Sequence, residues 1–197
     1  GADQLRIERI RLAVPADNIK TEDLVRTSGY SSEQMYAELL NIANSFSDGD
    51  LKLIVTTILE ENRKPLLYWP AAYKLHHAVR GGLLMHTLSI ARLCEGVCAV
   101  YPFIDRDLLL SGAILHDIAK IQEFNVNDAG VAEGYTVEGN LLGHLTMGAN
   151  YIDRVAEKLG IERKTSVLLQ HMVLSHHGEP EFGAAVRPMF IEAEILS

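Results

Sequence analysis

The sequence predicts an all-α helical bundle with one small inserted β-hairpin and a strand-like lead-in at its N-terminus. Most of the chain after residue 30 repeats apolar side chains at helical spacing. The breaks between these stretches carry capping residues, glycine or proline. Only residues 121–140 change to short β-type runs around a turn. At 197 residues the chain is long enough to bury one core as a single domain.

The lead-in comprises residues 1–28. Apolar residues alternate imperfectly with charged ones over 4–14, which predicts a strand, and a polar linker follows it. A strand needs a partner in a sheet, and no β-type run follows before residue 121. We therefore expect residues 1–28 to be the end of another domain and residues 29–197 to form the bundle.

The helices of the bundle follow one another in order, each with a signal for its end. A Ser-Ser cap opens the first predicted helix, and an Asp-Gly-Asp sequence separates it from the second. Pro102 ends the third, Asp105 caps the fourth, and Gly160 and Gly178 end the fifth and sixth. The hairpin over 121–140 turns at Asn-Asp-Ala-Gly and lies between the fourth and fifth helices. The predicted helices span 31–46, 48–62, 83–101, 106–120, 141–160, 162–178 and 189–197.

Composition limits the partners of this protein. The net charge is −8, from 18 basic and 26 acidic residues, which argues against a broad nucleic-acid-binding surface. A phosphate-bearing substrate must then be met locally, and metal ions can offset its charge. No unbroken apolar run reaches the length of a membrane span and no secretory signal is visible, so we expect no membrane partner. Cys94 and Cys98, one helical turn apart, predict buried thiols in a reducing, cytoplasmic setting.

Eight histidines, none in the first 75 residues, are the main functional signal. A single histidine on an apolar helix is more often a hydrogen-bonded core residue than a ligand. Several together are costly to bury without partners, whereas one divalent cation satisfies several imidazoles. The doublet His116–Asp117 lies at the end of an apolar helix, with Lys120 one turn later. An imidazole with a carboxylate suits Mn²⁺, Fe, Ni²⁺, Zn²⁺ or Mg²⁺ in a hydrolytic site better than a structural zinc.

The order of these residues on successive helices resembles the HD superfamily of metal-dependent phosphohydrolases. The order is His, then His-Asp, then His, then His-His, at His86, His116–Asp117, His144 and His176–His177. Four blocks between residues 65 and 196 are most similar to the HD domain of the YhaM-type 3′→5′ exoribonucleases. The resemblance implies an HD-domain helical bundle, preceded in that family by an OB-fold whose last strand is similar to residues 5–14.

The resemblance also implies a site with two divalent ions, Mn²⁺ favoured. It assigns His86, His116 and Asp117 to the first ion. The Asp117 carboxylate would bridge to a second ion held by His144 and His176, with His177 as a further ligand. Relatives usually carry Glu before the first ligand histidine, where this chain has Met85. Their last ligand is an Asp just beyond the position of Ser197, so we expect this ligand set to be truncated.

Further residues are expected to contact substrate. Lys120 resembles the phosphate-contacting lysine of the family, although a solvated helix-end lysine is an equal alternative. Arg80 and Arg187 flank the predicted site and are candidates to clamp phosphate, with surface salt bridges as the alternative. His77, or His177 if it holds no metal, is the candidate acid for the leaving group. His76 and His171 are assigned to structure.

Three functions remain open from the sequence. The resemblance favours a 3′→5′ exonuclease on single-stranded RNA or DNA in the intact protein. The negative charge and the lack of an aromatic-rich basic groove favour a phosphohydrolase of small or cyclic nucleotides. A non-catalytic metal-binding domain is the third, and a homo-oligomer is possible in each case.

Overall fold

The computed structural model of the chain describes Arg11, Val14, residues 30–73 and residues 79–197. Most of the predicted N-terminal strand and linker, and both His76 and His77, lie outside these residues. The predictions made for them stay predictions.

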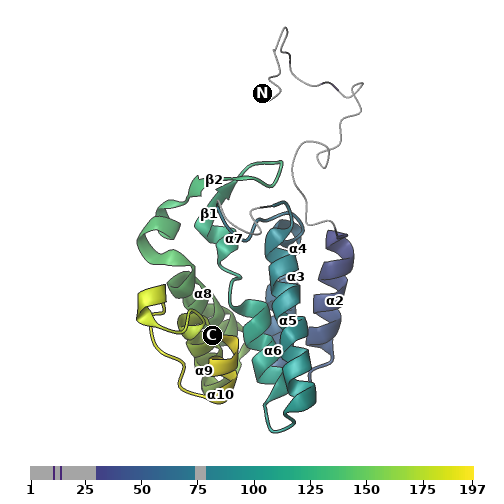
Figure 1. The fold of residues 1–197 in the computed structure, drawn as a ribbon, viewed down its shortest axis with the longest axis vertical. Coiled ribbons are helices and arrows are strands. Elements are labelled where there is room, and N and C mark those ends of the chain that lie inside the picture. The colour runs from purple at the N-terminus through teal and green to yellow at the C-terminus, as the bar shows by residue number, and fades with distance from the viewer. Residues whose placement is uncertain (1–10, 12–13, 15–29, 74–78) are drawn as a thin grey trace, which may run out of the picture.

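The described residues form a helical bundle capped at one end by a hairpin, which confirms the predicted all-α fold (Figure 1). Two short helices, α4 and α7, were not predicted as separate elements. A 3₁₀ turn, η2 (Pro180–Phe182), interrupts the predicted loop after the sixth helix. The helices are α2 (Ser32–Asn44), α3 (Gly49–Glu61), α4 (Arg63–Leu66), α5 (Gly82–Val100), α6 (Arg106–Leu115), α7 (Lys120–Glu123), α8 (Val137–Leu159), α9 (Arg163–Ser175) and α10 (Ile191–Leu196).

Helix α6 is the centre of the bundle. Every residue from Leu108 to Leu115 is buried, and the helix contacts α2, α3, α5, α9 and α10. A helix that is apolar all round has to be enclosed in this way. Gly112 permits the close approach of α9, because a Cβ there would lie 2.3 Å from the Met172 Cε atom. Asp105 accepts a hydrogen bond from the Leu108 amide and caps the start of α6, as predicted.

The predicted helix over 106–120 is shorter in the structure. α6 ends at Leu115, residues 116–119 form turns, and α7 begins at Lys120. The amides of Ile118 and Lys120 bond three residues back, to the carbonyls of Leu115 and Asp117. This tighter path breaks the helix at the His116–Asp117 doublet, inside the bundle.

The hairpin pairs β1 (Phe124–Val126) with β2 (Ala132–Tyr135) in antiparallel register, and Phe124 lies opposite Tyr135. The Asn127 side chain accepts hydrogen bonds from the amides of Ala129 and Val131 and so shapes the predicted turn. The hairpin adjoins α7 at the upper end of the bundle in Figure 1.

Helix α8 begins four residues earlier than predicted and is kinked. The Thr136 hydroxyl caps it by accepting from the Gly139 amide, and Gly143 has a non-helical backbone with φ +69°. A Cβ at Gly139 would lie 2.3 Å from the Glu123 carbonyl oxygen, so only glycine fits there. The first turn of α8 therefore lies directly against the end of α7.

Helix α5 corrects one expectation from composition. This helix is long and apolar enough to cross a membrane, judged by its length and mean hydropathy alone. Of its most apolar 18-residue stretch, 33% is buried inside the protein. The core helix of a globular protein meets the same test, and α5 packs against α2 and α6. The absence of a membrane partner stays a prediction.

Candidate metal centre

The ends of four long helices bring together the histidines that the sequence singled out. His86 lies in the first turns of α5, His144 follows the kink of α8, and the doublets follow α6 and α9 directly. Two groups result, each with its nitrogen and oxygen donor atoms within 4.8 Å of one another. One group is His86, His116 and Asp117, and the other is His144, His176 and His177.

The Asp117 carboxylate lies between the two groups. Its Oδ2 atom is 3.5 Å from His86 Nε2 and 3.3 Å from His116 Nε2. Its Oδ1 atom is 3.5 Å from His144 Nε2 and 3.6 Å from His176 Nε2. Each oxygen therefore faces a different pair of imidazoles, which is the arrangement that a bridging carboxylate requires.

Backbone carbonyls fix the orientation of two of these imidazoles. His116 Nδ1 is 2.8 Å from the Ala113 carbonyl and His176 Nδ1 is 2.8 Å from the Val173 carbonyl. Because a carbonyl only accepts, each Nδ1 donates to it, and the Nε2 atom of each ring is turned toward Asp117. Metal-ligating histidines are commonly held by such a contact on the other ring nitrogen.

Glu123 orients a third imidazole and was missed by the sequence reasoning. Its Oε1 atom accepts from His144 Nδ1 and from the His144 amide, both at 3.0 Å. The side chain is buried at the end of α7, and α8 packs onto it through Gly139. The sequence offers one signal for this role of Glu123, its position six residues after the His-Asp doublet and directly before a β-type run. The spacing of residues along the sequence does not show that α8 packs against Glu123.

The protonation states suit metal binding. Burial raises the pKa of Asp117, but the charge and hydrogen bond of His116, together with Lys120 and His144, lower it well below the usual value. Burial lowers the pKa of His176 to about 2, with His116 adding to the effect, and burial also lowers the pKa of His177. At neutral pH Asp117 is therefore ionised and His176 and His177 are neutral, the forms that bind a cation.

Three buried atoms of the cluster have no hydrogen-bond partner among the described residues. They are Asp117 Oδ1, His144 Nε2 and His177 Nδ1. A buried acceptor without a partner costs about 1–3 kcal/mol. A divalent cation between Asp117 Oδ1 and His144 Nε2, which lie 3.5 Å apart, would satisfy both atoms, so the donor set fits a metal on physical grounds.

Lys120 lies in the cluster, as predicted. Its ammonium group is 2.8 Å from Asp117 Oδ2, and its backbone carbonyl accepts from the Trp69 indole at 2.9 Å. It is a mostly buried residue, which removes the alternative of a freely solvated lysine. Its contact with substrate remains a prediction.

The two predicted arginines have other contacts in this structure. Arg80 donates to the Asp128 carbonyl and lies 5.4 Å above the Tyr68 ring, against the hairpin turn. Arg187 forms an exposed ion pair with Glu179, the alternative that the sequence left open. It also lines a small surface cavity beside His177. Their roles in substrate binding stay predictions.

His171 does not join the cluster. Its Nε2 atom accepts a hydrogen bond from the Met189 amide at 3.0 Å, and its ring contacts Phe190. These contacts support the structural role assigned to it.

A cavity of about 430 Å³ opens beside the cluster. Lys120, His144 and His177 line part of it, and a group of aromatic rings lines another part. This group of rings, which lies beside the cluster, was not found from the sequence. The rings belong to Tyr73, Phe124 and Tyr135.

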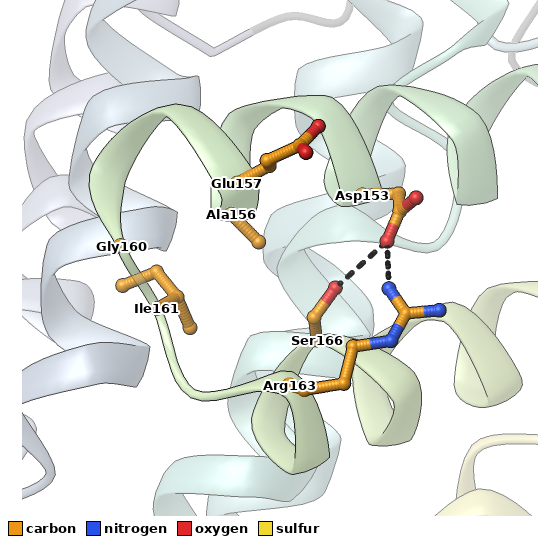
Figure 2. Close-up of a pocket in the computed structure, with 7 residues that line it drawn as sticks. All are labelled: Asp153, Ala156, Glu157, Gly160, Ile161, Arg163 and Ser166. Carbon is orange, nitrogen blue, oxygen red and sulfur yellow. Dashed lines mark hydrogen bonds and ion pairs between the residues drawn. The ribbon is translucent and has the colours of Figure 1, made fainter.

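A second cavity, of about 480 Å³, lies between α8 and α9 and has a different character. Figure 2 shows Asp153 joined to both Arg163 and Ser166 across it. These polar groups satisfy one another, and no histidine of the described residues lines this cavity. It is a closed local network and does not extend the metal centre.

Comparison with known proteins agrees with this geometry. The HD domain family matches residues 83–197, which contain both histidine groups. The chain belongs to the HD domain family. It is 37% identical over 196 residues to a protein of Bacillus licheniformis named 3′-5′ exoribonuclease YhaM, and 38% identical to the Geobacillus sp. WCH70 protein of that name. A Listeria monocytogenes protein of the same name is 35% identical.

The three alignments span the whole of this chain but only 60–62% of each relative. No solved structure gives a significant match. The resemblance seen in the sequence is thus confirmed, and an HD domain with such relatives supports an enzyme of the hydrolase class.

Proposed function

We propose that this HD domain hydrolyses phosphodiesters with divalent metal ions and that the whole protein is a 3′→5′ exonuclease on single-stranded RNA. The observation that carries the proposal is the buried Asp117 carboxylate, whose two oxygens face different histidine pairs. The names and identities of the relatives support the direction of attack and the RNA substrate.

The residues fall into two ion sites in this proposal. His86, His116 and Asp117 Oδ2 hold one ion, and His144, His176, His177 and Asp117 Oδ1 hold the other. When bound, two divalent ions lower the pKa of water at the site and neutralise the phosphate oxygens. The resemblance to the YhaM-type exoribonucleases favours Mn²⁺, and the mixed imidazole and carboxylate donors also suit Fe, Ni²⁺, Zn²⁺ or Mg²⁺.

The protein's own groups position these donors and the substrate. Glu123 holds His144 with Nε2 toward the carboxylate. Lys120 stabilises the ionised Asp117 and presents its remaining N–H donors to a phosphate oxygen at the cavity wall. His77, outside the described residues, is the proposed donor of a proton to the leaving oxygen. Arg80 and Arg187 reach substrate only if they leave their present partners.

Hydrolysis of small nucleotides is the second candidate. The net charge of −8 repels a long phosphate backbone, and the described arginines near the site are engaged with the protein's own oxygens. Under this proposal the same ions and donors act on a mononucleotide or a cyclic nucleotide.

Two expectations are kept as proposals, one about the family's last carboxylate ligand and one about the cellular compartment. The family's last carboxylate ligand is proposed to follow α10, and a Cβ at Gly178, next to His177, would lie 3.8 Å from Ser197. The two free thiols, Cys94 and Cys98, support a reducing, cytoplasmic setting.

An end-labelled RNA assay tests the proposed function. A 5′-labelled single-stranded RNA is incubated with the protein in Mn²⁺ and in EDTA, beside AMP and a cyclic mononucleotide. A ladder that shortens from the 3′ end only in Mn²⁺ is expected. Rapid turnover of the mononucleotides without any RNA shortening would replace the exonuclease with the second candidate, and no turnover of any substrate would reject both.

A further inference from the structure

The cavity beside the metal centre has two kinds of wall. Lys120, Glu123, His144 and His177 form the polar wall, and Lys120 and the histidines would hold a phosphate group there. The other wall consists of aromatic rings in contact with one another. The Tyr135 ring centre lies 5.1 Å from that of Phe124 and 6.0 Å from that of Tyr73. Two small residues, Ala71 and Ala72, complete it and leave room beside the rings.

The hairpin fixes the position of the aromatic wall relative to the histidines. Phe124 directly follows Glu123, which binds His144, and the register places Tyr135 opposite Phe124. Thr136, next in sequence, donates its hydroxyl to the Gln122 carbonyl and caps α8. The strand that carries Tyr135 is thus paired with the residue that directly follows Glu123, which orients a metal-ligand candidate.

Accessibility distinguishes the two aromatic partners of the hairpin. Phe124 is 4% exposed and supports the wall from behind, whereas Tyr135 is 44% exposed. An aromatic cross-strand pair stabilises a hairpin when both rings are covered. Here one ring remains open toward a cavity of about 430 Å³, a volume typical of small-molecule sites.

A nucleotide combines the two chemistries that these walls offer. Its phosphate suits the lysine and histidine wall, and its base has a flat π-face that stacks on an aromatic ring. We propose that Tyr135 stacks on the base of the terminal nucleotide whose phosphate lies at the metal centre. This inference rests on the proposed function and adds a base-binding subsite to it. Stacking tolerates every base, which suits an enzyme that removes nucleotides in succession.

Binding measurements test the subsite without relying on turnover. The probes are the phosphonate analogue of AMP, which cannot be hydrolysed, and the matching ribose phosphonate without a base, both titrated by calorimetry in Mn²⁺. The wild-type protein should bind the base-bearing probe roughly 5- to 150-fold more tightly, the range that stacking contributes. Tyr135→Ala and Tyr135→Leu should bring this ratio toward one, and Tyr135→Phe should keep it.

The leucine variant separates stacking from packing. Leucine keeps apolar contact with Phe124 and preserves the hairpin, but it has no π-face. Phe103→Ala is the matched control, since Phe103 is also an exposed aromatic (71%) that contacts a tyrosine, and it lies between α5 and α6, away from the hairpin in sequence. It should leave the ratio unchanged.

A substrate lacking its last base gives the second readout. Wild-type kcat/KM should fall with an RNA whose 3′-terminal residue is abasic, and Tyr135→Ala should cause no additional loss on that RNA. A wild-type binding ratio near one, or an unchanged ratio in Tyr135→Ala, overturns the base-binding subsite even if RNA is shortened normally. Base-dependent binding with no phosphodiester hydrolysis rejects the proposed function and leaves the subsite standing.

Discussion

The two halves of the metal centre differ in how well they are satisfied by the protein alone. In the half formed at α5 and α6, Asp117 Oδ2 accepts from Lys120 at 2.8 Å and faces His86 and His116. In the half formed at α8 and α9, Asp117 Oδ1 and His144 Nε2 are buried without a hydrogen-bond partner among the described residues. His177 Nδ1 shares that condition.

This difference indicates which half depends more on an ion. The lysine already compensates one carboxylate oxygen, whereas the opposite oxygen is buried beside the His144 and His176 imidazoles without a hydrogen bond. Such an arrangement is costly unless a cation occupies it. We therefore expect the α8–α9 half to gain the most from metal binding and to depend on Glu123 for its shape.

The largest effect is expected from Asp117→Ala, which breaks both halves at once. Loss of a carboxylate shared by two ions should reduce turnover by about a thousandfold or more, since several kcal/mol of charge stabilisation are removed. The helical content by circular dichroism should stay near that of the wild type, because Asp117 orients donors and fills little core volume. Asp128→Ala, an exposed aspartate in the hairpin turn, is the control. Near-normal turnover in Asp117→Ala would reject the mechanism.

A smaller effect is expected on stability when metal is added. Mn²⁺ at about 100 times its Kd should raise the free energy of unfolding by about 2.7 kcal/mol. Urea unfolding of metal-free and Mn²⁺-loaded protein measures this change. The gain should vanish in Asp117→Ala. Equal stabilisation of both proteins would show that the ion binds elsewhere.

The smallest of the three effects sharpens the comparison between the halves. Glu123→Ala removes the acceptor that orients His144 and should weaken Mn²⁺ binding in the α8–α9 half by about 10- to 100-fold. Binding in the other half should change little. Glu123→Gln keeps an amide oxygen as acceptor and should lose less, and Glu133→Ala on the hairpin serves as control. Titration followed by the electron paramagnetic resonance of free Mn²⁺ resolves the two affinities. An equal loss in both halves contradicts the assignment.

Local signals in the sequence predicted most of the fold. Asp105 and Gly160 act locally as cap and terminator, and both were placed correctly. The break at His116 was not predicted, because it arises from consecutive tight turns where α6 meets the surrounding helices. The kink at Gly143 also depends on how α8 packs, since glycine itself is compatible with a helix.

The site was predictable as a set of residues but not in its geometry. The resemblance to the HD superfamily, which the order of the histidines carries, implied both groups that the structure brings together. Glu123 and the aromatic wall at Tyr135 were missed because both depend on contacts between the hairpin and α8. The partners of Arg80 and Arg187 likewise follow from loop positions that spacing does not encode.

The most direct test of the central claim is anomalous diffraction from crystals of this protein grown with Mn²⁺. The account predicts two manganese peaks on opposite sides of the Asp117 carboxylate, one near His86 and His116 and the other near His144 and His176. Manganese absent from Asp117, or a single ion bound by all of these histidines, would contradict a carboxylate that bridges two ions.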